Sequence, residues 1–166
     1  MKGEIPMKKM LSLVLVLALC LTAVAAYAAT PSKVVGTVEI ANEDITIIPP
    51  TEEETEAATA ELEKLEEEGS AAYFGTELTE VDEFGPINAE VGKDIVIGDD
   101  GKVEVTFKVD FPFNKDENVV VLLGVLNENK TLTWNRFDGV ADGNGAVTAR
   151  VIPEVLDNAS FIAIGK

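Results

Sequence analysis

The clearest alternation of apolar and polar positions lies in the C-terminal half of the chain. Across residues 103–109, valine and phenylalanine alternate with Glu104, Thr106 and Lys108. Because successive side chains of a strand point to opposite faces, this pattern predicts a half-buried antiparallel strand. The run Val119–Leu126 is apolar on both faces, which is typical of a central strand.

Shorter runs of β-prone residues occur from residue 33 onward, and turn signals separate them. The spacing of these turn signals predicts seven to nine strands. Turns are expected at Asn42–Asp44, 99–101, 127–130 and 138–145, because Asn, Asp and Gly favour them. The expected fold is mainly β, an antiparallel β-sandwich. The positions predicted to share one core between its two sheets are Val103, Val105, Phe107, Val109, Val121, Leu123, Val125, Val147, Val151, Ile162 and Ile164.

One segment, at about residues 51–68, has the composition of a helix. Thr51 and Glu54 have the spacing of a capping box, and Gly69 is a natural end. This segment contains nine glutamates and one lysine, Lys64. The apolar stripe is narrow, which favours packing on a sheet with one face in solvent; docking of a basic partner is the alternative. The stripe consists of Ala58, Leu62 and Leu65.

The N-terminus resembles a secretory signal peptide. Two lysines precede the uncharged run Met10–Ala26, and the sequence Ala26-Tyr27-Ala28 is a small-x-small cleavage signature. We therefore expect residues 1–28 to be removed and residues 29–166 to form one secreted domain, without a membrane anchor after cleavage. A retained anchor and lipidation at Cys20 are the alternatives; the leucine before Cys20 disfavours lipidation.

Composition narrows the possible chemistry. The net charge is −17, and removal of residues 1–28, with three lysines and one glutamate, makes it −19. Such a charge excludes nucleic acids and anionic membranes as partners. The chain has no histidine and its one cysteine lies in the leader, which removes thiol nucleophiles, Ser-His-Asp triads and the usual zinc sites. Phosphate-binding glycine motifs are missing as well. We expect no enzyme, no catalytic residues and no cofactor.

Two groups of residues are candidate binding positions. Asp138, Asp142 and Asn144 resemble part of a calcium loop but do not complete the EF-hand pattern, so a turn is favoured over a metal site. Trp134 and Tyr73 are candidates for a carbohydrate platform. The favoured interpretation of Trp134 is core packing, with Arg136 stacked over its ring.

Six segments carry a resemblance to known proteins: Tyr73–Gly75, Val103–Phe107, Phe111–Phe113, Val119–Leu126, Thr133–Trp134 and Ser160–Ile164. In these features the chain, from Glu77 onward, resembles small secreted proteins of anaerobic Gram-positive bacteria that have no assigned function. Similar tryptophan-bearing hairpins occur in immunoglobulin-like modules of surface proteins. The resemblance covers about the C-terminal two thirds and implies an Ig-like fold.

These observations predict an extracellular, non-catalytic binding or structural module. Its partner would be an extracellular protein or a surface polymer. The alternative function is that of a calcium-binding protein or a carboxylate-dependent hydrolase, because carboxylates are so numerous. A homodimer is also expected, formed through the N-terminal strand 34–40 or through the acidic helix, since an apolar edge strand needs a neighbour.

Overall fold

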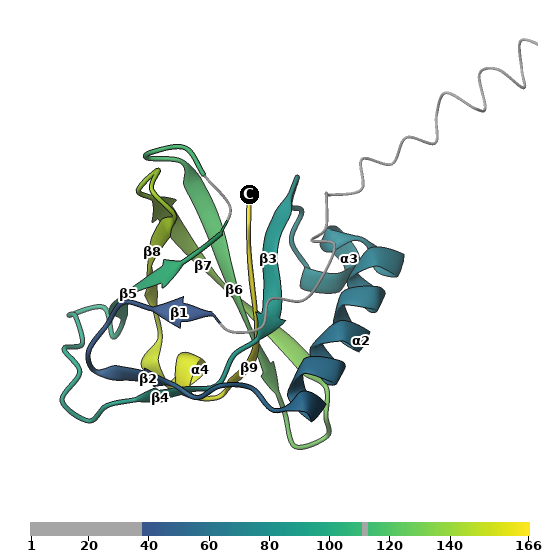
Figure 1. Cartoon of the computed structure of the whole chain (residues 1–166), viewed down its shortest axis with the longest axis horizontal. Coiled ribbons are helices and arrows are strands. Elements are labelled where there is room, and N and C mark those ends of the chain that lie inside the picture. Colours follow the sequence, from purple (N-terminus) through teal and green to yellow (C-terminus); the bar gives the residue numbers. More distant parts are fainter. Residues whose placement is uncertain (1–37, 111–112) are drawn as a thin grey trace, which may run out of the picture.

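The computed structural model describes residues 38–110 and 113–166, and most of its strands join in one antiparallel sheet (Figure 1). Its strands are β1 (Glu39–Ile40), β3 (Val81–Pro86), β5 (Val103–Lys108), β6 (Asn118–Leu126), β7 (Leu132–Ala141), β8 (Ala146–Val151) and β9 (Ala159–Gly165). Their order across the sheet is β1-β5-β8-β7-β6-β9-β3. The prediction of a mainly antiparallel β fold is confirmed.

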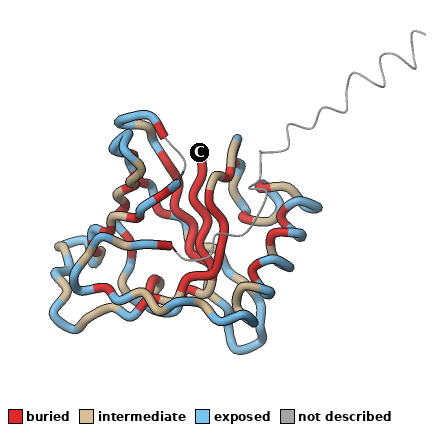
Figure 2. Tube along the Cα trace, viewed as in Figure 1, coloured by how far each residue is buried: buried red, intermediate tan, exposed pale blue. Residues whose placement is uncertain are grey.

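Strand β6 lies in the interior of the sheet, between β7 and β9, as its continuous apolar sequence predicts. It pairs along its length with β7, where Leu122 lies opposite Arg136, and with β9, where Leu122 lies opposite Ala163. Its residues from Val119 to Leu123 are buried whichever face they occupy. Both faces of β6 are therefore covered by other parts of the chain (Figure 2).

The sheet curls around an inner core. A two-stranded sheet of β2 (Ile45–Ile47) and β4 (Ala89–Val91), together with helix α4 (Pro153–Asp157), packs against that core. All the predicted core positions are buried in it except Val125, which is partly exposed. The spacing of turns predicted a β-sandwich with its core between two sheets. The structure has one large curled sheet of seven strands and one small sheet of two strands.

The acidic helix forms as predicted and covers the outer face of the sheet. Helix α2 (Glu52–Glu68) packs on β3 together with α3 (Ser70–Phe74). The main-chain N–H of Glu54 donates to Thr51 Oγ1 at 3.2 Å, and that of Thr51 donates to Glu54 Oε2 at 2.7 Å, which completes the capping box. Leu62 and Leu65 of the predicted stripe are buried in a second cluster, which we call the outer core, and Ala58 is buried on the same helix. The buried residues of the outer core are Leu62, Leu65, Phe74, Leu78, Val81, Phe84, Val120, Leu122 and Ala163, and Tyr73 and Trp134 pack against them. The apolar stripe of the helix is therefore covered by other residues of the same chain.

Three predictions need correction or fall outside the described residues. The loop expected at 138–145 is shorter, because β7 continues through Ala141 and pairs with both neighbouring strands. Helices α3 and α4 were not predicted. Of the strand expected from residue 33, only the part from Val38 is described, and the leader 1–28 is outside the described residues. Within the described part of the chain, none of the helices has the length and apolar character needed to cross a membrane.

Candidate functional site

The structure brings Trp134 and Tyr73 together, in the outer core. Their ring centroids are 5.8 Å apart, and Phe74 and Phe84 lie 4.9 Å and 6.1 Å from Trp134. Trp134 also lies over Gly124 of β6, where an added Cβ would be 2.9 Å from its Cζ3. These contacts attach α3 to the sheet, so packing accounts for both aromatic residues.

The polar groups beside this aromatic cluster are engaged within the chain. The Tyr73 hydroxyl donates to Glu61 Oε2 at 2.7 Å, and burial together with that carboxylate raises the pKa of Tyr73 well above its usual range. Arg136 donates to Thr76 Oγ1 at 2.8 Å and lies 3.3 Å from an Asp138 oxygen. The guanidinium is therefore held by these two residues, in place of the stacking predicted over Trp134.

The three candidate calcium ligands have separate structural roles. Asp138 belongs to β7 and pairs with Arg136. Asp142 Oδ1 accepts the main-chain N–H groups of Asn144 at 2.6 Å and Ala146 at 3.0 Å, which closes the turn between β7 and β8. Across the described residues, no group of three or more acidic, histidine or cysteine side chains is arranged to hold a metal ion.

A cluster of charges that sequence reasoning missed surrounds the side chain of Lys166. The end of the sheet on which it lies is the one marked C in Figure 1. Lys166 Nζ lies 3.2 Å from Glu117 Oε1, 3.5 Å from Glu80 Oε2 and 5.8 Å from the Phe113 ring centre. We call Glu80, Asp82, Glu83, Glu117 and Lys166 the Lys166 cluster. Asp82 and Glu83 belong to β3 and Glu80 directly precedes it, Lys166 directly follows β9, and Glu117 directly precedes β6, so only the sheet topology brings them together.

Asp82 has the most unusual environment in the Lys166 cluster. Its Oδ2 is buried without a hydrogen-bond partner among the described residues. Burial first, and then the charge of Glu80, raise the pKa of Asp82 from 3.8 to about 7, although Lys166 acts in the opposite direction. A carboxyl group that holds a proton near neutral pH can serve as a general acid, but buried ion clusters also shift pKa values in this way.

Replacing Asp82 by asparagine should stabilise the protein at alkaline pH and leave its stability at acid pH almost unchanged. Because the pKa is raised to about 7 in the folded state, that state binds the extra proton between about pH 4 and pH 7. Asp82 therefore lowers the free energy of unfolding as the pH rises through this window. The full shift would correspond to about 4 kcal/mol, which solvent at this half-exposed side chain reduces to about 1–2 kcal/mol.

Urea unfolding of Asp82→Asn at a series of pH values measures this difference. Asp99→Asn, at an exposed turn position, is the matched control for the loss of one negative charge. Equal effects of Asp82→Asn at acid and alkaline pH would contradict the assignment.

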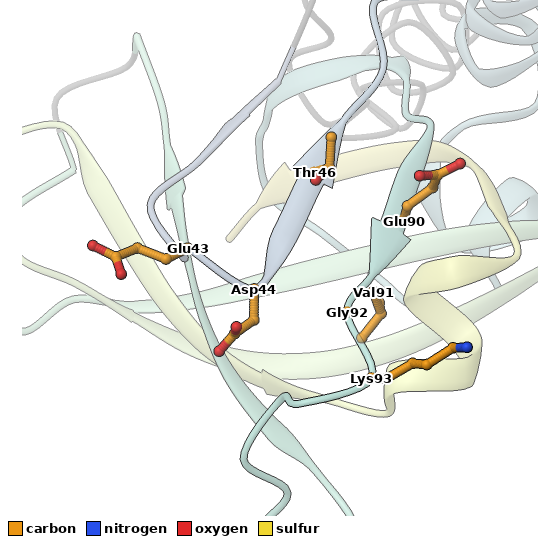
Figure 3. Close-up of a pocket in the computed structure, with 7 residues that line it drawn as sticks. All are labelled: Glu43, Asp44, Thr46, Glu90, Val91, Gly92 and Lys93. Atoms are coloured by element: carbon orange, nitrogen blue, oxygen red, sulfur yellow. The ribbon is translucent and has the colours of Figure 1, made fainter.

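Three surface hollows provide further candidate sites. The β2–β4 hollow has a volume of about 390 Å³, and in Figure 3 the side chains of Glu43, Asp44 and Glu90 point away from one another. The Arg150 hollow, of about 450 Å³, includes Val96, which is 83% exposed, and Arg150, whose guanidinium forms an ion pair of 2.7 Å with Asp100 outside the lining. Neither arrangement directs several unused polar groups to one point.

The third hollow, which we call the α4 groove, has a volume of about 500 Å³. It lies between α4 and the β6–β7 hairpin, beside the point where the register of β6 and β9 shifts. Next to this shift Val125 is half-exposed and Leu126 is exposed, whereas the residues before them, from Val119 to Gly124, are buried. The residues lining the groove are Val125, Leu126, Asn127, Thr133, Asn135, Glu154, Val155 and Asn158.

Three asparagine side chains that line the α4 groove form hydrogen bonds with main-chain groups. Asn158 Nδ2 donates to the carbonyl of Glu154 at 2.8 Å, and Asn135 Nδ2 donates to the carbonyl of Leu123 at 3.4 Å. Asn127 Oδ1 accepts from two main-chain N–H groups of its own hairpin, of which the closer is 2.8 Å away. The groove therefore combines an apolar surface with fixed amides, one hydroxyl and one carboxylate.

No protein family, curated protein or solved structure matches this chain.

The residues of the α4 groove were not candidates at the level of the sequence. Asn127 was assigned to a hairpin turn, and Asn135 belongs to a predicted strand. The local signals for α4 are Pro153, which occupies the first helical turn, and Asn158, which follows the last. These signals indicate a short helix but do not indicate which surface it faces.

Proposed function

We propose that this protein is an extracellular, non-catalytic binding module whose ligand site is the α4 groove. The observation that carries this proposal is the pairing of an apolar surface with polar groups that are already fixed. Ligand sites are commonly apolar hollows with a few well-placed polar groups, and fixed side chains reduce the entropy lost on binding. The lining contains one titratable side chain, Glu154, so it offers no acid–base pair for catalysis.

The place of action in this proposal is outside the cell. The lysines, apolar run and small-residue exit of the leader support export, and the resemblance to small secreted Ig-like proteins is consistent with it. The two sheets that enclose the inner core are the feature that this chain would share with such sandwiches. The partner would be an extracellular protein or surface polymer that reaches the α4 groove.

Self-association remains part of the proposal, through a surface other than the helix stripe. Ala58, Leu62 and Leu65 are buried within the chain and are not available to a second copy. Val96 and Ile97, which are 83% and 53% exposed, form the apolar surface that a dimer could bury instead. Two chains of charge −17 would associate more strongly at high salt.

Titration of the isotope-labelled whole protein with a panel of peptides and neutral oligosaccharides tests the binding function. A ligand should shift the NMR signals of Asn127, Asn135 and Asn158. Thr133→Trp, which fills the groove, should abolish these shifts. Thr131→Trp, at an exposed hairpin position that does not line the groove, should preserve them. A panel in which every bound compound shifts Tyr73 and Trp134 instead, or none shifts the groove, would refute the proposal.

A further inference from the structure

We infer that the α4 groove accepts the lysine side chain of an extended peptide segment from its partner. This inference rests on the proposed function and specifies its ligand. The groove has unused acceptors, an apolar surface of suitable shape and no basic residue of its own, and the whole protein attracts cations.

The acceptors are defined by the hydrogen bonds that the amides already make. Asn135 and Asn158 each donate an amide N–H to a main-chain carbonyl. A carbonyl can only accept, so the orientation of each amide is determined, and its oxygen and its second N–H are left for a ligand. Among the described residues, no lysine or arginine forms an ion pair with Glu154. The lining therefore offers two amide oxygens and a carboxylate as acceptors, and an ammonium group, with three N–H donors and no acceptor, needs groups of this kind.

The apolar part of the groove suits the aliphatic stem of lysine. Val125 and Val155 are half-exposed, and Leu126 is 42% exposed although it ends a strand whose centre is fully buried. Lysine packs its methylene groups along apolar surface while the ammonium group stays at a polar rim. A cationic ligand without an aliphatic chain would leave these three side chains exposed to water.

The lack of a basic side chain in its lining separates this groove from the other two hollows. The β2–β4 hollow has the carboxylates of Glu43, Asp44 and Glu90 but also contains Lys93. The Arg150 hollow has the carboxylates of Asp44 and Glu104 but also contains Lys102 and Arg150. The lining of the α4 groove contains Glu154 and no basic residue. A net charge of −17 raises the local concentration of cationic ligands and repels anionic ones, an effect that salt weakens.

The test is an NMR titration of the whole protein with the peptide acetyl-Gly-Gly-Lys-Gly-Gly-amide. Two related peptides carry acetyl-lysine or norleucine at the central position, and spermidine serves as a free aliphatic cation. The lysine peptide should shift the groove signals, and its affinity should fall at least about fivefold when the ammonium is acetylated or replaced, the size expected of a partly exposed charged contact. Its affinity should also fall as salt is added.

Glu154→Gln should weaken binding of the lysine peptide about fivefold, because it removes the carboxylate from the groove. Glu128→Gln, at an exposed position of the β6–β7 hairpin, removes the same charge outside the groove and should bind as the wild type does. Loss of binding in both variants would assign the effect to net charge and overturn the inference.

The remaining outcomes separate this inference from the proposed function. Equal binding of the acetyl-lysine peptide, or binding of neutral oligosaccharides alone, would overturn the lysine assignment and leave the binding function intact. Tighter binding of spermidine than of the peptide would overturn the peptide as occupant. Absence of any groove shift with every compound would refute both.

Discussion

Replacing Phe84 by alanine should lower the free energy of unfolding by about 3–5 kcal/mol, the usual cost of emptying a phenylalanine site in a core. Phe84 is fully buried on β3, and its ring lies 6.4 Å from that of Tyr73 and 6.1 Å from that of Trp134. Because α2 and α3 pack on β3 through this outer core, the cavity would weaken the attachment of both helices to the sheet.

Phe107→Ala provides the matched comparison, since Phe107 is equally buried but belongs to the inner core. Trp134 reports on the outer core, so its fluorescence and the far-ultraviolet circular dichroism can be followed together during urea unfolding. In Phe84→Ala the fluorescence should change at lower urea than the circular dichroism. In Phe107→Ala the two signals should change together. Coincident transitions in both variants would mean that helices and sheet unfold as one unit.

The parts of the fold that were predictable from sequence are those governed by local interactions. Helix α2 has its start and end encoded by Thr51, Glu54 and Gly69, which act within a few residues of themselves. Strand β5 shows its buried face by alternation, and β6 shows its central position by the lack of any polar face. Each of these signals depends only on neighbouring residues.

The curl of the sheet and the positions of the short helices depend on pairings between distant segments. The β-prone runs have the same appearance in one curled sheet as in two packed sheets, so the pattern alone could not separate these folds. Asp138 illustrates the limit. Its sequence neighbours favour a turn, but pairing of Asp138 with Val120 keeps it in β7. Pairing across the sheet outweighed the local preference there.

The candidate sites show the same limit. Trp134 is a candidate binding residue in the sequence because it is the only tryptophan, and its large aromatic ring also suits it to pack α3 against the sheet. The α4 groove is lined by common residues, which come together only through the placement of α4 beside the register shift at Val125. Asp82 is one carboxylate among many in the sequence, and its proton affinity is raised only by burial beside Glu80.

The end of the sheet beside the Lys166 cluster leads to the second large prediction, which concerns Gly165. A Cβ at Gly165 would lie 2.3 Å from the main-chain oxygen of Glu80, and that oxygen accepts the N–H of Lys166 at 2.9 Å. Because the obstacle is main chain, β3 and β9 would have to separate. Gly165→Ala should therefore lower the free energy of unfolding by about 2–4 kcal/mol, from overpacking and lost hydrogen bonds.

Gly101→Ala is the control, because Gly101 has a φ of +74° but open space around its Cβ position. Its cost should be about 1 kcal/mol, the strain of an alanine in the left-handed region. Gly165→Ala should also flatten the pH dependence assigned to Asp82, since separating the strands admits water to the buried carboxyl oxygen. Urea unfolding of both variants at neutral and acid pH measures the two effects. If Gly165→Ala were no less stable than Gly101→Ala, the close pairing of β3 with the end of β9 would be wrong, and with it the burial that raises the pKa of Asp82.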